Sequence, residues 1–172
     1  IGVSYDGTGY GPDGTAWGGE ILVADRRQYR RAFHLLPVPL PGGEAAISHP
    51  GRMALSHLIA AFGADEALAI ARRLLPDMPE PEARVIARQI ERRINCPMTS
   101  SMGRFFDAVA ALLGAMPEAT YEGQPAMELE AMAAGSAGFS LPSRAMARGE
   151  GDTLLPPGYT LGDGVIDTRP IV

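Results

Sequence analysis

The spacing of hydrophobic positions at the start of the chain predicts strands. Apolar and polar side chains alternate or form short apolar runs, and the segments are separated by brief glycine-rich or polar connections, a pattern typical of antiparallel pairing. The expected strands cover residues 1–6, 15–24 and 28–36. The run from Pro37 to Gly43 is rich in proline and glycine and predicts a loop. We therefore expect a strand-rich part over residues 1–40.

From residue 50 onward the apolar spacing changes to the three-and-four pattern of helices. The expected helices cover residues 50–62, a segment from Asp65 to about Leu75, residues 81–94, a segment from Ser100 or Ser101 to Gly114, and residues 124–134. Asp65 is the expected N-cap of the second helix, and Pro81 suits the first turn of the third. Gly114 is expected to end the fourth. A helical part over residues 50–135 follows.

The last part of the chain carries weaker signals. Glycine, serine and proline dominate from residue 135 to residue 159, and residues 164–167 form one weak strand. Residues 136–172 are therefore expected to be loop-rich with a single strand. Strands followed by helices and a final strand favour a mixed α/β or α+β fold.

Composition disfavours some functions. The chain has 172 residues, a formal net charge of -5, and 15 basic residues that are all arginine. An acidic balance argues against a nucleic-acid partner or an anionic membrane surface. No apolar run approaches the ~20 residues that span a bilayer. The single cysteine, Cys96, allows no disulfide within the chain, which favours a reducing cytoplasm. We interpret Cys96 as an inert side chain.

The segment from Asp6 to Glu20 holds more glycine than a hairpin needs. Glycine permits positive φ angles and close backbone approach, so this segment could offer amides to an anion, with Asp6 near a metal or hydroxyl. Two structural alternatives remain. Asp6 could bond its own following amides in an Asx-turn, and Gly18 and Gly19 could mark a β-bulge.

Two further positions could contact a ligand. Asp107 lies four residues after Gly103, so both share a helix face, one that suits the hydroxyl pair of a ribose. Compensation of the helix dipole is the alternative for Asp107. Gly123 precedes a helix whose N-terminus could face a ligand. The three histidines, His34, His49 and His57, are interpreted as structural, and the arginines at 84, 88 and 92 as a solvated face.

Several motifs resemble HypF-type hydrogenase-maturation carbamoyltransferases. They are SYDGTGYGPDGTAWGGE (residues 4–20), LPGGEAA (40–46), INCP (94–97), TSSMGRFFDAVAALLG (99–114) and YEG (121–123). They occur in the order of the family and span most of the chain. The resemblance implies an ASKHA fold, of the actin-like or ribonuclease-H-like type. It also implies kinship with TsaD-type tRNA threonylcarbamoyl enzymes and antibiotic O-carbamoyltransferases. Both ends of the chain resemble cut ends, so we expect a fragment of such a domain.

The resemblance also implies an activity. An upstream domain of these enzymes makes carbamoyl-adenylate from carbamoyl phosphate and ATP, and the domain seen here passes the carbamoyl group to the C-terminal cysteine thiolate of a HypE-type partner. The product leads to the cyanide ligand of a nickel–iron centre. Alternatives are transfer to a small hydroxyl compound or to tRNA, and a non-catalytic interaction module.

Site residues follow from matching positions. Asp6 matches a ligand of a divalent metal, iron or zinc, whose other ligands are expected outside the chain. Gly18, Gly19 and Glu20 match the segment that contacts the acyl phosphate of the adenylate. Asp107 matches the aspartate that holds the ribose, and Gly123 a glycine of the same pocket. No catalytic general base is evident.

Overall fold

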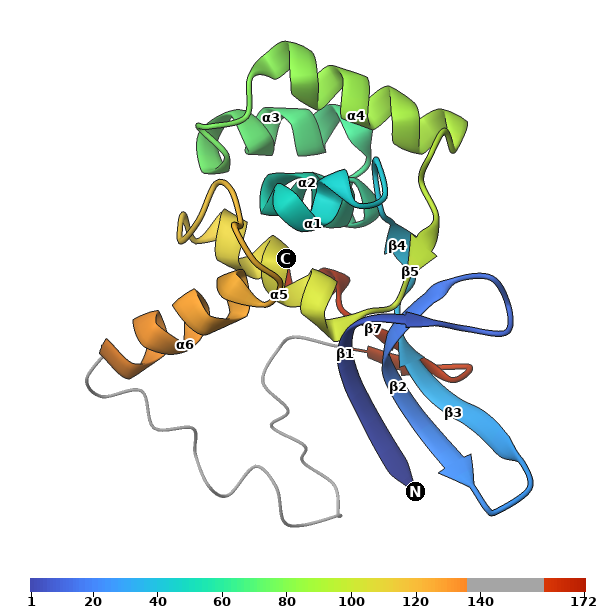
Figure 1. Cartoon of the computed structure of the whole chain (residues 1–172). Coiled ribbons are helices and arrows are strands. Elements are labelled where there is room, and N and C mark those ends of the chain that lie inside the picture. Colours follow the sequence, from blue (N-terminus) through green and yellow to red (C-terminus); the bar gives the residue numbers. More distant parts are fainter. Residues whose placement is uncertain (136–159) are drawn as a thin grey trace, which may run out of the picture.

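The structure, a computed structural model, describes residues 1–135 and 160–172, with the backbone alone for residues 160–162. A twisted sheet lies beside a layer of helices in which α2 is central (Figure 1). The prediction of a mixed α/β fold is confirmed. The predicted loop over residues 136–159 lies outside the described residues.

The sheet is built on the hairpin that begins the chain. Its strands are β1 (Gly2–Tyr10), β2 (Ala16–Ala24), β3 (Tyr29–Leu35), β4 (Val38–Pro39), β5 (Met98–Thr99), β6 (Thr160–Gly162) and β7 (Val165–Asp167). The order is β4-β5-β2-β3-β7-β6, and β1 pairs with the other side of β2. β2 runs antiparallel to β1 and β3, as expected, whereas β5 pairs parallel with β2 and β7 parallel with β3.

Three expectations about the strands were wrong. Residues 160–172 hold two strands and not one, because β6 pairs antiparallel with β7. β1 does not end at Asp6 but continues to Tyr10, with an irregular register between Tyr5 and Gly9 that absorbs part of the glycine run. The segment from Pro37 to Gly43 is not all loop, because β4 lies inside it and pairs with β5. A two-residue strand is held by its partner almost sixty residues away, which the local sequence does not encode.

The helices pack around α2. Their bounds are α1 (Ala45–Ser48), α2 (Pro50–Phe62), α3 (Ala64–Leu74), α4 (Glu80–Arg92), α5 (Met102–Leu112) and α6 (Gln124–Gly135), with a 3-10 helix at Arg169–Ile171. Met53, Leu55 and Leu58 of α2 are fully buried and join Ile86 of α4 in one hydrophobic core. α2 also packs along α5, which connects the core to the sheet.

Most helix ends follow their expected chemistry. The Ser101 side chain accepts a hydrogen bond from the Arg104 backbone N–H and so caps α5. Gly114 has φ 71° just past the end of α5, and its N–H donates to Ala111 O. Asp65 is not an N-cap: Gly63 takes that place, and Asp65 lies inside the first turn of α3, where its charge suits the helix dipole.

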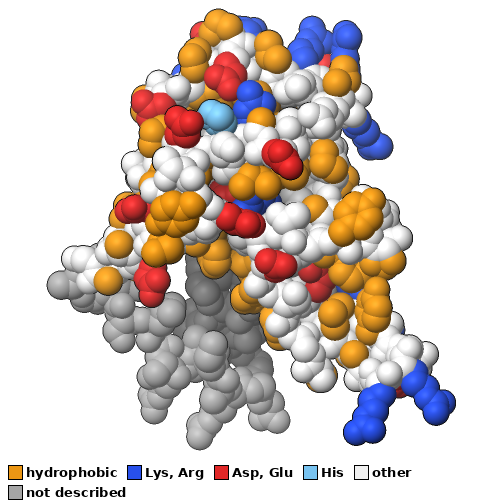
Figure 2. Space-filling model, viewed as in Figure 1, with side chains coloured by type: hydrophobic (Ala, Val, Ile, Leu, Met, Phe, Trp, Pro, Cys, Tyr) orange, Lys and Arg blue, Asp and Glu red, His pale blue; other side chains and the backbone are white. Residues whose placement is uncertain are grey.

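Charge is unevenly distributed over the surface. Figure 2 shows Arg side chains at the helical end and at the turn between β2 and β3, with acidic side chains across the middle of this face. Arg84, Arg88 and Arg92 of α4 are exposed, as the solvated-face interpretation predicts. No helix in the described part of the chain is both long and apolar enough to cross a membrane.

Candidate nucleotide pocket

A pocket of about 300 Å³ opens where β1, the start of α5 and the start of α6 meet. It is lined by Tyr5, Asp6, Gly7, Met102, Gly103, Arg104, Phe106, Asp107, Glu122, Gly123 and Ala126. Asp6, Asp107 and Gly123 had each been predicted as site residues, and the structure brings them to one cavity. A cavity of similar volume, about 310 Å³, opens between His49 and Glu118 and contains none of the predicted site residues.

Asp6 and Gly7 form the β1 side of the pocket. The Asp6 side chain is exposed, and its Oδ1 atom accepts a hydrogen bond from the Gly7 N–H at 2.7 Å. The Asp6 side chain therefore bonds the amide that directly follows it, whereas the Asx-turn considered as an alternative bonds the amide two residues on. The hydrogen bond from Gly7 occupies one carboxylate oxygen with the chain's own backbone.

The backbone of β1 lies directly against the first turn of α5. A Cβ added to Gly103 would lie 2.7 Å from the Gly7 Cα atom, so glycine is required at Gly103 for this contact. The Ser101 hydroxyl lies 2.6 Å from Asp6 O and 2.7 Å from Gly7 O, and donates to one of them at a time. The group that approaches Gly103 is thus β1 itself, and the contact sets the distance between two walls of the pocket.

Asp107 lies on α5 at the pocket, one turn after Gly103, and pairs with Arg104. The Arg104 Nε atom is 3.0 Å from the Asp107 Oδ2 atom, and both side chains are at most 3% exposed. Burial and, to a smaller extent, the Glu122 carboxylate together raise the pKa of Asp107 to about 6, against the opposing effect of the Arg104 charge. The Asp107 carboxyl therefore changes charge just below neutral pH.

The segment before α6 closes the pocket opposite β1. Gly123 has φ 82°, a conformation that favours glycine, and its carbonyl accepts a hydrogen bond from the Met127 N–H in the first turn of α6. A Cβ added to Gly7 would lie 2.7 Å from Glu122 Oε1 and 3.4 Å from Arg104 Nη2. Glu122 thus reaches across to β1. The carboxylates of Asp6 and Glu122 and the guanidinium of Arg104 therefore lie near this part of the cavity.

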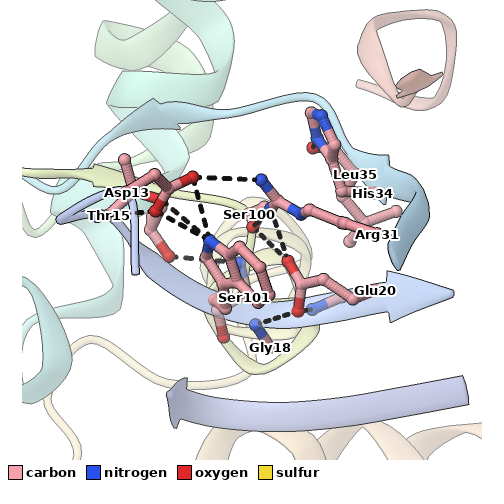
Figure 3. A network of polar contacts seen from close by, with 12 residues as sticks. Asp13, Thr15, Gly18, Glu20, Arg31, His34, Leu35, Ser100 and Ser101 are labelled. Carbon is pink, nitrogen blue, oxygen red and sulfur yellow. Dashed lines mark hydrogen bonds and ion pairs between the residues drawn. The ribbon is translucent and has the colours of Figure 1, made fainter. Parts of the chain in front are cut away.

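Glu20 is the centre of a buried polar network behind the pocket (Figure 3). Its Oε2 atom accepts hydrogen bonds from the Gly18 and Gly19 N–H groups at 2.6 and 2.8 Å. Its Oε1 atom accepts from Arg31 Nη2 at 2.7 Å and from the Ser100 hydroxyl at 2.5 Å. The four donors come from β2, from β3 and from the residue before the α5 cap, so Glu20 joins the sheet to the helix that carries Asp107.

Gly18 and Gly19 line no part of the pocket. A Cβ on Gly18 would collide with Asp6 O, and one on Gly19 with Ser100 O, so both glycines serve close backbone packing here. Their amides already donate to Glu20. The acyl-phosphate role expected of Gly18, Gly19 and Glu20 remains a prediction, and it would require Glu20 to release the two amides.

The described residues do not by themselves fit a metal centre. Asp6 provides one carboxylate, and nowhere in residues 1–135 or 163–172 do three or more His, Cys, Asp or Glu side chains gather as possible ligands. Metal ions are held by several such ligands together. The iron or zinc implied by the resemblance would need its remaining ligands from elsewhere.

The histidines and the cysteine lie away from the pocket. His57 is buried in α2 with its ring edge-on to Phe105, and burial lowers its pKa to about 4. Burial also raises the pKa of the Cys96 thiol, which therefore stays protonated and weakly nucleophilic at neutral pH. Both findings agree with the structural interpretation of these side chains.

Three residues of the site were missed from the sequence. Arg104 and Glu122 line the pocket, and Ser101 holds β1 against α5. A signal was present for Arg104, because it is a charged residue in the first turn of the most apolar helix. No comparable signal marks Glu122, whose place depends on the fold of the loop.

Comparison with known proteins identifies the family of this chain. The family model described as "Carbamoyltransferase, Kae1-like Domain, second subdomain" matches residues 2–170. The fold is thus that of a Kae1-like carbamoyltransferase domain, as the ASKHA prediction required. The chain belongs to the HypF carbamoyltransferase family, as the second subdomain of that domain.

Relatives and solved structures support this membership. The chain is 37% identical over 172 residues to the carbamoyltransferase HypF of Rhizobium leguminosarum bv. viciae, covering 100% of this chain and 20% of that protein. It is 48% identical over 133 residues to HypF of Rhodobacter capsulatus, covering 77% of this chain and 17% of that protein.

Two solved structures resemble this chain. Full-length HypF in its phosphate- and nucleotide-bound form gives a TM-score of 0.74 at 39% identity, over 99% of this chain and 20% of that one. HypF of T. kodakarensis gives a TM-score of 0.78 at 32% identity, over 98% of this chain and 21% of that one. The chain therefore spans about a fifth of the length of these proteins.

Proposed function

We propose that this chain forms one wall of the adenylate site in a HypF-type carbamoyltransferase. The observation that carries the proposal is the single pocket shared by Asp6 and Gly7 of β1, Gly103 and Asp107 of α5, and Gly123 before α6. Family membership supplies the reaction class, and the pocket supplies a place for the nucleotide part of the intermediate.

The proposed reaction is carbamoyl transfer from carbamoyl-adenylate. The whole enzyme would make this intermediate from carbamoyl phosphate and ATP. The C-terminal cysteine thiolate of a HypE-type partner attacks the carbamoyl carbon, an S–C bond forms, and the bond to the phosphate oxygen breaks to release AMP. A thiolate is a strong nucleophile, and the mixed anhydride is a good acyl donor.

The residues of this chain would bind and orient the nucleotide. Asp107, ionised above pH about 6, can accept hydrogen bonds from both ribose hydroxyls. Gly123 and the first turn of α6 bound the opposite side of the cavity. These contacts would hold the carbamoyl donor in place while the thiolate attacks. Such positioning raises the reaction rate.

The region around Asp6 would face the phosphate end of the intermediate. In the proposal Asp6 is one ligand of a divalent metal, with the others contributed from outside the described residues, and we assign the metal no step. Gly18 and Gly19 could donate to the acyl phosphate once Glu20 has released their N–H groups.

Isotope transfer tests the reaction. The longest natural polypeptide that carries this chain is supplied with ¹⁴C-carbamoyl phosphate and ATP, with a HypE-type partner or with that partner lacking its C-terminal cysteine. We expect label on the intact partner alone. Label on tRNA or on a small hydroxyl compound would instead identify a different acceptor, and nucleotide binding without any transfer would favour a non-catalytic module.

A further inference from the structure

The charge pair inside α5 is unusual for its burial. Arg104 is 2% exposed and Asp107 likewise 2%, and both line the pocket. A buried ion pair contributes little net stability compared with apolar side chains of the same volume, because both charges lose their hydration. Its location at a cavity, with a perturbed carboxyl, is typical of functional sites.

The pair lacks the other partners that buried charges usually have. Within the described residues, Nε and Nη1 of Arg104 and Oδ2 of Asp107 make no hydrogen bond of good geometry. Nevertheless Arg104 Nε and Asp107 Oδ2 lie 3.0 Å apart. The guanidinium is therefore the positive charge that holds this carboxylate, and no hydrogen bond on that oxygen replaces it.

The other charges near Asp107 oppose its ionisation. Glu122 faces it from the segment before α6, and its charge raises the pKa of Asp107, as burial does. Asp6 adds a third carboxylate to the cavity from β1. On the α2 side, His57 packs against Phe105 and stays neutral above pH about 4. Of the charges that act on Asp107, Arg104 is the one that favours the carboxylate form.

Resting on the nucleotide site inferred above, we propose that Arg104 is a positioning residue that keeps the Asp107 carboxylate ionised and fixed in orientation for the ribose diol. The Oδ2 atom of Asp107 faces Arg104, so the Oδ1 atom is the one that would accept from the two neighbouring hydroxyls, one at each of its lone pairs. A protonated carboxyl loses part of that acceptor capacity. Arg104 thus acts on the ligand through Asp107.

The test compares two nucleosides as a function of pH. Adenosine carries the diol, and 2′,3′-dideoxyadenosine lacks it. Neither carries a phosphate, which would itself titrate near pH 6. Binding is measured by calorimetry between about pH 5 and pH 9 on the longest natural polypeptide that carries this chain. In the unaltered protein we expect adenosine affinity to rise through pH about 6 and then level, with no such rise for the dideoxy compound.

The Arg104→Met variant removes the charge at similar volume. Loss of a close opposite charge raises a carboxyl pKa by about 1–3 units, so the rise in adenosine affinity moves to higher pH and affinity at pH 7 falls about tenfold. Arg104→Lys retains the charge and should keep the midpoint near its original pH. The matched control is Arg88→Met, an exposed arginine paired with exposed Glu91, which should change nothing.

A purely structural role gives a different result. In that case Arg104→Met would weaken the binding of both nucleosides equally at every pH, and the pH midpoint of adenosine binding would not move. That outcome overturns the proposal. The Asp107→Asn variant should bind adenosine without pH dependence. Adding Arg104→Met to it should then cause no further loss of discrimination between the two nucleosides.

A measurement on the unaltered protein covers the case in which Arg104→Met fails to fold. The Asp107 carboxyl is titrated by carbon-13 NMR, with Arg104→Lys for comparison. A midpoint near 6 supports the proposal, whereas a midpoint above neutral pH overturns it. If the protein binds no nucleoside or nucleotide, the proposed function fails, but this titration still tests the role of Arg104.

Discussion

The core around α2 and the junction between β1, β2 and α5 both contain fully buried side chains, but the chemistry of these side chains differs. In the core, Met53, Leu55 and Leu58 are at most 1% exposed and entirely apolar. In the junction, Glu20 and Arg104 are 1% and 2% exposed and carry charge. The core is stabilised by hydrophobic burial, which has no directional requirement. The junction depends on each donor meeting its acceptor.

This difference shows where the fold specifies geometry. Apolar cores tolerate rearranged packing when volume is kept, whereas a buried charge without its partner is strongly destabilising. The junction therefore has fewer permitted arrangements than the core. It forms the walls of the pocket, where the positions of Asp6 and Asp107 matter most.

The core should show the largest loss of stability. Leu58→Ala leaves a cavity beneath α2 and should reduce the free energy of unfolding by about 2–5 kcal/mol. Val85→Ala on α4 is the control, because Val85 is 59% exposed and its change should stay within about 0.5 kcal/mol. Urea unfolding, followed by the fluorescence of Trp17, measures both. Equal losses would mean that α2 does not form the core.

Disturbing the backbone contacts of the junction should cause the second-largest loss of stability. Gly18→Ala places a Cβ against Asp6 O at a φ of 152°, and should cost about 2–3 kcal/mol through overlap and backbone strain. Gly135→Ala is the matched change, since nothing lies within 4 Å of its Cβ position. It should be neutral or slightly stabilising. The same unfolding assay would contradict the close-packing account if Gly18→Ala were tolerated.

Removing the charge of the buried Glu20 carboxylate should cause the third-largest loss of stability. Glu20→Gln keeps the shape but removes the charge opposite Arg31 and one acceptor, so we expect a loss of about 2 kcal/mol. Glu91→Gln breaks the exposed pair with Arg88 and should change stability by less than about 0.5 kcal/mol. If the two variants unfold at the same urea concentration, the Glu20 network does not stabilise the junction.

The two regions should also respond to pH in opposite directions. The pKa of His57 is lowered to about 4, so the folded core loses stability as pH falls from about 6.5 to 4. The pKa of Asp107 is raised to about 6 from 3.8, so the junction loses stability as pH rises across that window. The pH dependences from His57 and Asp107 largely cancel in the unaltered chain. The net change in its stability with pH should therefore be the smallest of the effects predicted here.

Single variants should separate these opposing slopes. After His57→Leu, stability between pH 4 and 6 should fall with rising pH, and after Asp107→Asn it should rise, each by at most about 1.4 kcal/mol per pH unit. Urea midpoints collected across this range give the slopes directly. Identical slopes in the two variants would contradict the assigned ionisation states.

The sequence predicted the elements whose signals are local. The apolar spacing of α2 and α5, the Ser101 cap and the Gly114 stop each depend on neighbours within a few residues, and the structure confirms them. It did not predict β4, because Val38–Pro39 becomes a strand only by pairing with β5. Asp65 had the side chain of an N-cap, yet Gly63 is the N-cap of α3 and the helix begins at Ala64.

The site also has residues that the sequence predicted and environments that only the fold determines. Asp6, Asp107 and Gly123 were identified from motif positions, and the fold brings them to one pocket. The environment of Glu20 could not be predicted, since its acceptor oxygen meets Ser100 from 80 residues away. The pairing of Arg104 with Asp107 follows helical spacing, but its burial depends on β1 lying over the first turn of α5.

The locked contact between β1 and α5 has a practical meaning for protein engineering. A Cβ at Gly103 would overlap the Gly7 backbone, so Gly103 cannot accept a larger side chain to reshape the cavity from that direction. Ala126 on α6 borders the same cavity and is half-buried. Libraries intended to admit a different base or sugar should therefore diversify the α6 side and leave Gly103 unchanged.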